Sequence, residues 1–93
     1  MRPAALEHTF TLSTQALFRD LGGEAVILDL QSGTYFGLNA VGTRIWQLIE
    51  QQGRLEAVFN QLCVEYEAPP DRLKSDLLEL VSRLSEAGLG ELT

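Results

Sequence analysis

The stretch from Leu30 to Trp46 constrains the fold more than any other part of the chain, because it holds a turn, a strand and a helix start in close succession. Gln31-Ser32-Gly33 has turn chemistry, and the β-branched and aromatic residues Thr34-Tyr35-Phe36 favour a strand. Asn39 is a residue type that commonly caps a helix, and apolar residues recur after it at helical spacing. The sequence therefore predicts a strand that leads directly into a helix.

Two further strand-length runs come before this stretch. Gln15 to Leu21 and Glu24 to Leu30 are joined by Gly22-Gly23, a pair that tolerates the positive φ angles of tight hairpin turns. Together with Thr34 to Leu38 they predict a small antiparallel sheet of three strands. Residues 8–13 alternate like a half-buried strand, which would lie along the domain or exchange with a neighbouring molecule.

Three helices are expected after the sheet. The first runs from about Ala40 to Gln52, and Trp46 should anchor it in the core with its N–H at an acceptor on the rim. The second carries apolar residues on one helical face from Leu55 to Tyr66, and Cys63 belongs to that face as a small buried hydrophobe. The third runs from about Pro70 to Glu86.

These elements predict one α+β domain of order βββααα, in which the helices cover the apolar face of the sheet. A chain of 93 residues suffices for one domain with a modest core. We expect the folded domain to span residues 14–90. Residues 1–13 would be a lead-in, flexible over its first part, and residues 91–93 a C-terminal tail.

Charge and composition exclude several classes of partner. Seven basic against thirteen acidic residues give a net charge of −6, which argues against nucleic acid because affinity for phosphates comes largely from Lys and Arg. A single cysteine cannot form an internal disulfide, in keeping with a reducing cytoplasm. No apolar run is long enough for a membrane span, and the N-terminus lacks a signal pattern.

The residues that carry catalytic or metal chemistry are almost missing from the sequence. His8 is the only histidine and lies in a polar setting near the N-terminus. No Cys-x-x-Cys, His-x-x-x-His or carboxylate cluster indicates a metal site, and Glu65 and Glu67 fall on different sides of their helix. We therefore expect a protein that is not an enzyme and that needs no cofactor or metal.

One set of residues carries a resemblance to a known family. These are Gly23-Glu24, Val26-Ile27-Leu28-Asp29, the run from Ser32 to Asn39, Val41-Gly42 and Ile45-Trp46. They are similar to the PqqD-like family, and the similarity extends more weakly over about residues 14–90. Its most specific part is the pattern Tyr-x-x-Leu-Asn-x-x-Gly-x-x-Ile-Trp.

The resemblance implies a function in binding peptides. PqqD-like proteins are winged-helix-like recognition elements for RiPPs, the ribosomally made and post-translationally modified peptides. They bind the leader segment of a precursor peptide and present it to a modifying enzyme or a leader peptidase, such as a lasso-type protease or a radical-SAM enzyme. In this family the leader adds as a strand beside the third strand and lies in the groove between that strand and the third helix.

The residues support such a site independently, because strand addition uses exposed backbone groups for affinity and side-chain pockets for specificity. Gly37 would let a foreign backbone approach, and Tyr35 and Phe36 would line opposite faces of the sheet. The strand side of the site would comprise Thr34, Tyr35, Phe36, Gly37 and Leu38. The helix side would be drawn from Lys74, Asp76, Leu77, Leu78, Leu80 and Val81.

Most of these residues also have a purely structural interpretation. Phe36 and Leu38 would suit the core, and Leu77, Leu80 and Val81 are core residues first, with only their outer edges free for a ligand. Tyr35 and Leu78 can be singly exposed apolar residues, and Lys74 and Asp76 can be solvated charges.

Two other functions stay open at this point. A winged-helix DNA-binding protein would share the fold, although Glu56, Glu65 and Glu67 and the absence of Lys in the second helix disfavour contact with DNA. A structural dimerisation module would use the same open strand edge, so a homodimer is an alternative use of that edge.

Overall fold

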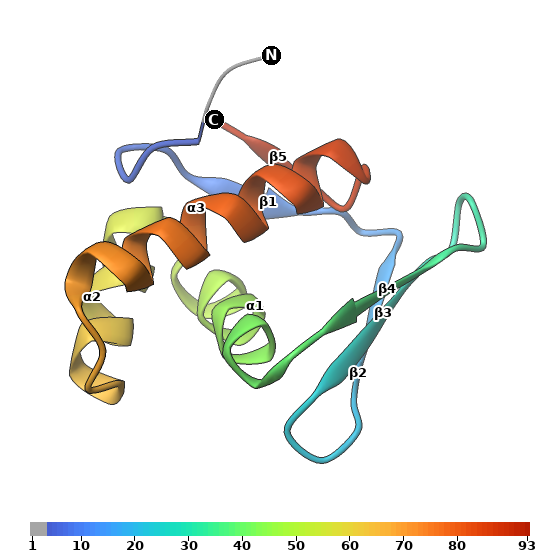
Figure 1. Cartoon of the computed structure of the whole chain (residues 1–93). Coiled ribbons are helices and arrows are strands. Elements are labelled where there is room, and N and C mark those ends of the chain that lie inside the picture. Colours follow the sequence, from blue (N-terminus) through green and yellow to red (C-terminus); the bar gives the residue numbers. More distant parts are fainter. Residues whose placement is uncertain (1–3) are drawn as a thin grey trace.

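The computed structural model describes residues 4–93 as a three-stranded antiparallel sheet, three helices and a separate pair of short strands (Figure 1). The elements follow in the order β1 (Phe10–Leu12), β2 (Ala16–Asp20), β3 (Ala25–Asp29), β4 (Tyr35–Leu38), α1 (Ala40–Gln52), α2 (Leu55–Glu65), α3 (Pro70–Glu86) and β5 (Gly90–Leu92). The predicted α+β class is confirmed, with three sheet strands before three helices. The first three residues of the predicted lead-in lie outside the described residues.

The sheet has the order β2-β3-β4, and both of its connections are hairpins. At the first turn Gly22 and Gly23 adopt φ angles of 89° and 107°, which L side chains rarely take. The Asp20 carboxylate accepts hydrogen bonds from both glycine N–H groups at 3.0 Å. The glycine pair therefore forms the hairpin that the sequence predicted.

The inner face of the sheet packs on α1, which lies between the sheet and α2, while α3 crosses α1 toward the sheet (Figure 1). Phe18 of β2 stacks on Trp46 with ring centroids 6.0 Å apart and an interplanar angle of 6°. Trp46 is 2% exposed and so anchors the helix in the core as predicted. Its indole N–H has no hydrogen-bond acceptor within residues 4–93, so the expectation of an acceptor on the rim is wrong.

The first turn of α1 packs tightly against the end of β4. The side chain of Asn39 accepts a hydrogen bond from the Gly42 N–H at 2.8 Å, which confirms the predicted N-cap. A Cβ atom on Gly42 would lie 3.2 Å from that Asn39 oxygen and 3.3 Å from Leu38. Glycine at this position therefore lets the helix begin directly above the strand.

Helix α2 contributes a narrower apolar face than the sequence suggested. Leu55, Val58 and Leu62 are fully buried, and Phe59 is half-buried. Cys63 is exposed, so the prediction of a buried thiol is wrong. At about 100° per residue, Cys63 lies roughly 100° from the middle of the buried residues, beyond the edge of the packed face.

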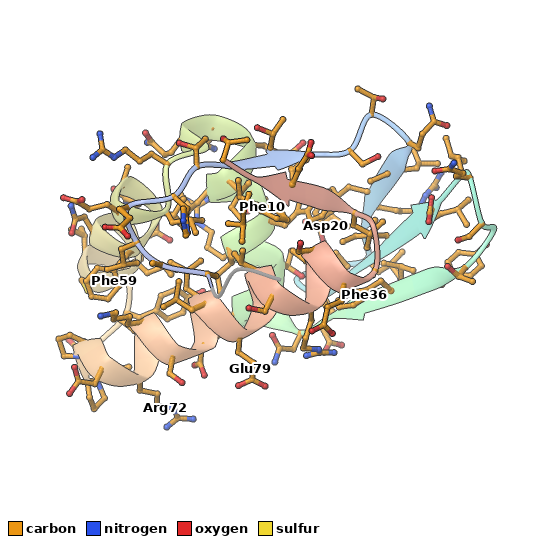
Figure 2. The ribbon with its side chains drawn as sticks, turned by 90° about the horizontal axis from the view of Figure 1, so that it is seen from above. Phe10, Asp20, Phe36, Phe59, Arg72 and Glu79 are labelled. Carbon is orange, nitrogen blue, oxygen red and sulfur yellow. The ribbon has the colours of Figure 1, made fainter. Side chains whose placement is uncertain are left out.

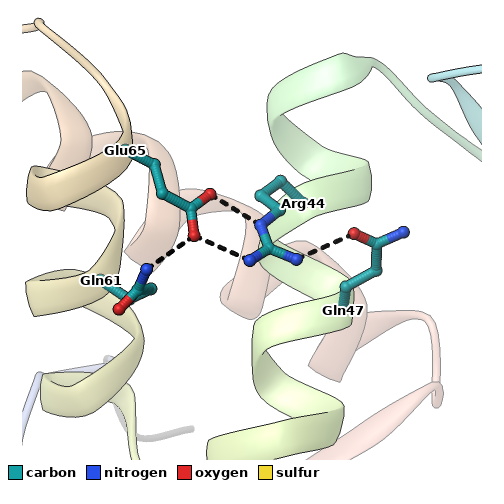
Figure 3. Close-up of polar contacts among 4 residues, drawn as sticks. All are labelled: Arg44, Gln47, Gln61 and Glu65. Atoms are coloured by element: carbon teal, nitrogen blue, oxygen red, sulfur yellow. Dashed lines mark hydrogen bonds and ion pairs between the residues drawn. The ribbon is translucent and has the colours of Figure 1, made fainter.

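Figure 3 shows a polar cluster that joins α1 to α2. The Arg44 guanidinium donates two hydrogen bonds of 2.7 Å to the Glu65 carboxylate, which also accepts one of 2.8 Å from Gln61. The Arg44 hydrogen bonds, together with the one from Gln61, lower the pKa of Glu65 to about 2. The carboxylate is therefore ionised at neutral pH, and its hydrogen bonds with Arg44 link the two helices.

Strands β1 and β5 bring the two ends of the described chain together. They pair antiparallel with Phe10 opposite Leu92, and Phe10 is 1% exposed. The Phe10 N–H donates to the Gly53 carbonyl at 2.9 Å, at the connection between α1 and α2. Residues 8–13 thus lie along their own domain, and the structure adds them and residues 91–93 to the fold beyond the predicted limits of 14 and 90.

Candidate functional site

Strand β4 is an edge strand whose outer backbone groups point away from the sheet. The Asp29 N–H donates to the Thr34 carbonyl at 2.9 Å, so this opposed pair is hydrogen-bonded. Bonded and non-bonded pairs alternate along an antiparallel ladder, so Phe36 also turns its N–H and C=O toward β3. Tyr35 and Gly37 turn theirs toward the open edge.

Within residues 4–93, no segment pairs with this open edge. The sheet order ends at β4, and β1 pairs with β5 in a separate sheet. Residues 4–13 therefore do not cover the edge. Two residues of β4 present free donors and acceptors to any strand that approaches from that side.

A groove of about 500 Å³ lies beside this edge, between the end of β4, the start of α1 and the side of α3. Its lining residues come from all three elements: Gly37, Leu38, Asn39, Val41, Gly42, Ile45, Arg72, Asp76, Glu79, Leu80 and Arg83. Figure 2 shows the C-terminal part of α3 beside β4, with Phe36 close to that part of the helix. The groove therefore has an apolar floor and a charged wall.

The side chains of β4 divide between the two faces of the sheet. Leu38 is 5% exposed and lines the groove, and Phe36 is half-buried on the same face, with the Arg83 guanidinium 5.2 Å from its ring centroid. Tyr35 is 73% exposed on the outer face, where Leu17 and Leu28 lie opposite each other in register with it. A separate hollow of about 390 Å³ lies on that outer face.

The structure separates the strand-side candidates accordingly. Gly37 and Leu38 line the groove, and Phe36 lies on the same face of the sheet beside Arg83. The Tyr35 side chain faces outward and does not line the groove, and only its backbone N–H and C=O face the open edge. Thr34 is exposed and precedes β4, and its carbonyl accepts the hydrogen bond from the Asp29 N–H inside the hairpin.

The helix-side candidates fall on different sides of α3. Asp76 and Leu80 line the groove. Leu77 and Val81 are 0% exposed, so neither offers surface to a ligand in this conformation. Lys74 and Leu78 do not line the groove: Lys74 is exposed, and Leu78 is half-buried against the core. Counted at 100° per residue, these last two lie on the opposite flank of the buried stripe from Asp76.

Sequence reasoning missed two groups of lining residues. Asn39, Val41, Gly42 and Ile45 reach the groove because the Asn39 cap starts α1 at the end of the edge strand. The cap was visible in the sequence and implied this proximity. Three charged residues of α3 were also missed, namely Arg72, Glu79 and Arg83. Helical periodicity identified the buried stripe but not which of its flanks faces the sheet edge.

A metal cluster and a membrane-spanning helix are both absent from the part of the chain that the structure describes. No group of three or more His, Cys, Asp or Glu side chains within residues 4–93 has an arrangement that would hold a metal ion. None of the helices in that range combines the length and the apolar character needed to cross a membrane.

Comparison with known proteins gives a family and two structural relatives. Residues 24–89 match the family described as coenzyme PQQ synthesis protein D (PqqD). The solved structure of TbiB1 in complex with the TbiA(beta) leader peptide superposes with a TM-score of 0.81 at 37% identity, over 87% of this chain and 94% of TbiB1. A lasso peptide synthetase B1 complexed with the leader peptide gives 0.78 at 28% identity, over 89% and 98%. The chain has no significant match among curated proteins.

Proposed function

Because the chain belongs to the PqqD family, we propose that it binds the leader segment of a ribosomally made precursor peptide, which adds to β4 as a fourth strand. The observation that carries this proposal is the open edge at Tyr35 and Gly37 beside a groove of about 500 Å³. An added strand alternates its side chains between the two faces of the sheet. One set would enter the groove, and the other would lie near Tyr35 on the outer face.

Backbone contacts provide affinity in this arrangement, and side-chain contacts in the groove provide specificity. The backbone groups of Tyr35 and Gly37 provide the ladder of hydrogen bonds, which any peptide sequence can make. Leu38 and Leu80, together with the first turns of α1, offer apolar surface for groove-facing side chains. Of the α3 residues expected from the sequence, Asp76 and Leu80 take part directly, while Leu77 and Val81 support the wall from inside.

In this role the protein is a non-catalytic adaptor. It holds the leader, and a separate enzyme modifies or cleaves the precursor further along its chain. Leader peptides are bound in both structural relatives, and one of them is a lasso peptide synthetase B1, which favours a lasso-type leader peptidase over a radical-SAM enzyme as partner. The adaptor acts in the cytoplasm, where the precursor is made.

Amide hydrogen exchange provides a direct test. The probe is a synthetic peptide that corresponds to the N-terminal segment of the precursor encoded beside the gene of this protein. On binding, the amides of Tyr35 and Gly37 should become protected, because they gain acceptors in the added strand. The amide of Phe36 already faces β3 and should change little, so protection should alternate along β4.

Two outcomes would contradict the proposal. If no neighbouring precursor segment binds at high protein concentration, the adaptor function is wrong. If a segment binds while Tyr35 and Gly37 stay unprotected, binding occurs elsewhere and strand addition to β4 is wrong.

Light scattering over a concentration series tests the competing use of the edge in a homodimer, which would protect the same amides without peptide. The acidic charge balance offers no support for DNA binding.

A further inference from the structure

The wall that α3 contributes to the groove carries four charged residues in one line. Arg72, Asp76, Glu79 and Arg83 all line the groove and are all exposed. At about 100° per residue they fall within roughly 60° of arc on the helix surface. Figure 2 shows Arg72 and Glu79 projecting from the same side of α3. Along the helix the groove therefore presents one positive charge, two negative charges and another positive charge.

These charges are not paired with one another. Arg72 and Asp76, and likewise Glu79 and Arg83, have the i, i+4 spacing that allows an ion pair on a helix. No ion pair or side-chain hydrogen bond within residues 4–93 involves any of the four. The Arg83 guanidinium lies instead 5.2 Å from the ring centroid of Phe36, on the side of the open edge. None of the four side chains therefore uses its ion-pairing or hydrogen-bonding groups within residues 4–93, and these groups are available to a peptide in the groove.

The spacing of the line suits an extended peptide. With a rise of about 1.5 Å per residue, Asp76 and Glu79 lie about 4.5 Å apart along the helix axis, and each arginine lies about 8 Å from the middle of that acidic pair. Groove-facing residues of a strand recur every two residues, or about 6.7 Å. Three successive groove-facing side chains therefore reach the first arginine, the acidic pair and the second arginine. The spacings of about 8 Å on the helix and about 6.7 Å on the strand differ by less than the length of an arginine side chain.

Taking the proposed function as its basis, we propose that this line of charges selects the leader by its charge pattern. A Lys or Arg of the leader lies between Asp76 and Glu79. An Asp or Glu two residues before it and another two residues after it lie at Arg72 and Arg83. The selected pattern is acid-x-base-x-acid. Because the line reads the same from either end, it fixes the register of the peptide on β4 and not its direction.

The test compares two double variants that change the net charge equally. Asp76→Asn with Glu79→Gln removes the acidic pair from the groove. Glu50→Gln with Glu91→Gln removes two exposed acids that do not line the groove, so it controls for the overall charge. Affinities are measured by calorimetry with the synthetic N-terminal segment of the neighbouring precursor, and with the same segment after its central base is replaced by norleucine.

The groove variant should bind the unmodified segment about fivefold more weakly or worse, and the control should bind it within twofold of the parent protein. With the norleucine segment the groove variant and the parent should differ by less than twofold. A segment that binds the parent but responds equally to both double variants would overturn the charge selection and leave leader binding intact. A segment that binds the parent protein tightly but lacks the acid-x-base-x-acid pattern would also overturn the charge selection. Failure of every segment to bind the parent would overturn leader binding and the selection with it.

Charge reversal keeps the proposal open to refutation if the neutral variants lose affinity through altered packing. Asp76→Lys with Glu79→Lys should prefer a segment whose central base is replaced by Glu, by about fivefold over the unmodified segment. The parent protein should show the opposite preference. If the reversed protein keeps the preference of the parent, the acidic pair does not read the peptide.

Discussion

Replacing Gly37 with proline tests how the edge of β4 is used. Proline removes one backbone N–H and places its ring where that N–H was. In the free protein the N–H of Gly37 points away from β3, so the substitution breaks no hydrogen bond of the sheet. Gly37 does not adopt a positive φ, and proline is tolerated in an edge strand when its nitrogen faces outward. The fold should therefore survive.

The loss in leader affinity follows from the same geometry. The added strand would keep a carbonyl that pointed at the Gly37 N–H, and this carbonyl would now lie in the interface without a donor. Such an unsatisfied group costs about 1–3 kcal/mol. At about 1.4 kcal/mol per factor of ten, Kd should rise by about 5- to 150-fold. The proline ring also holds the peptide backbone away from β4, which favours the upper end of this range.

Gly37→Ala is the matched control. A Cβ atom at this position meets no heavy atom within 4 Å, and alanine keeps the N–H. Leader affinity should stay within about threefold of the parent, since the added methyl group lies on the outer face of the sheet and not in the groove. Circular dichroism and thermal unfolding of both variants establish that the helices and the sheet are intact. Calorimetric titration with the leader segment then gives Kd.

A particular combination of results would refute the reasoning. If Gly37→Pro folds and binds the leader as tightly as Gly37→Ala, the outer N–H of Gly37 plays no part in binding and the peptide does not extend the sheet. Phe36→Pro gives the contrasting case, because the Phe36 N–H points at β3. That variant should lose stability before its affinity can be compared.

Three further predictions concern stability. Arg54 is the N-cap of α2, with φ −74° and ψ 124° and no side-chain cap, so Arg54→Thr should raise the free energy of unfolding by about 1 kcal/mol in urea titrations; a gain no larger than that of Arg54→Ala would contradict this. Gly90→Ala should lower the free energy of unfolding by about 1–3 kcal/mol because the new Cβ would overlap the buried ring of Phe10. An unchanged Tm would contradict this and show that the ring can move. Glu65→Gln should cost about 1 kcal/mol at pH 7 through the partly exposed pair with Arg44. Since the pKa of Glu65 is lowered from 4.5 to about 2, that contribution should be complete above about pH 4.5 and fade as the pH falls toward 2, so a difference between the variants that stays constant over this window speaks against the pair.

The strongest local signals in the sequence predicted the elements themselves. Gly22-Gly23 placed the first hairpin, and Asn39 placed the start of α1, because positive φ angles and N-cap hydrogen bonds depend only on nearby residues. The edge position of β4 followed from the order of the predicted elements, since this strand is the last of the predicted sheet and leads straight into a helix.

Features that depend on distant packing were not accessible in this way. The pairing of β1 with β5 joins residues about 80 positions apart and has no local signature. Cys63 was placed in the core because its position fits a helical stripe, and the stripe does not reveal how wide the packed face is. For the same reason Lys74 and Leu78 were predicted to line the groove, whereas Arg72, Glu79 and Arg83 line it in the structure.

The stacking of Phe18 on Trp46 gives the protein an intrinsic optical sensor. Trp46 is the only tryptophan, and its neighbour in the stack comes from β2, at the far edge of the sheet from β4. Any tilt of the hairpins relative to α1 alters that stack and hence the environment of the indole. The emission spectrum of the unlabelled protein therefore reports on the sheet when a peptide adds to β4. A change in emission indicates that the whole sheet shifts relative to α1, and an unchanged spectrum indicates that the sheet stays rigid.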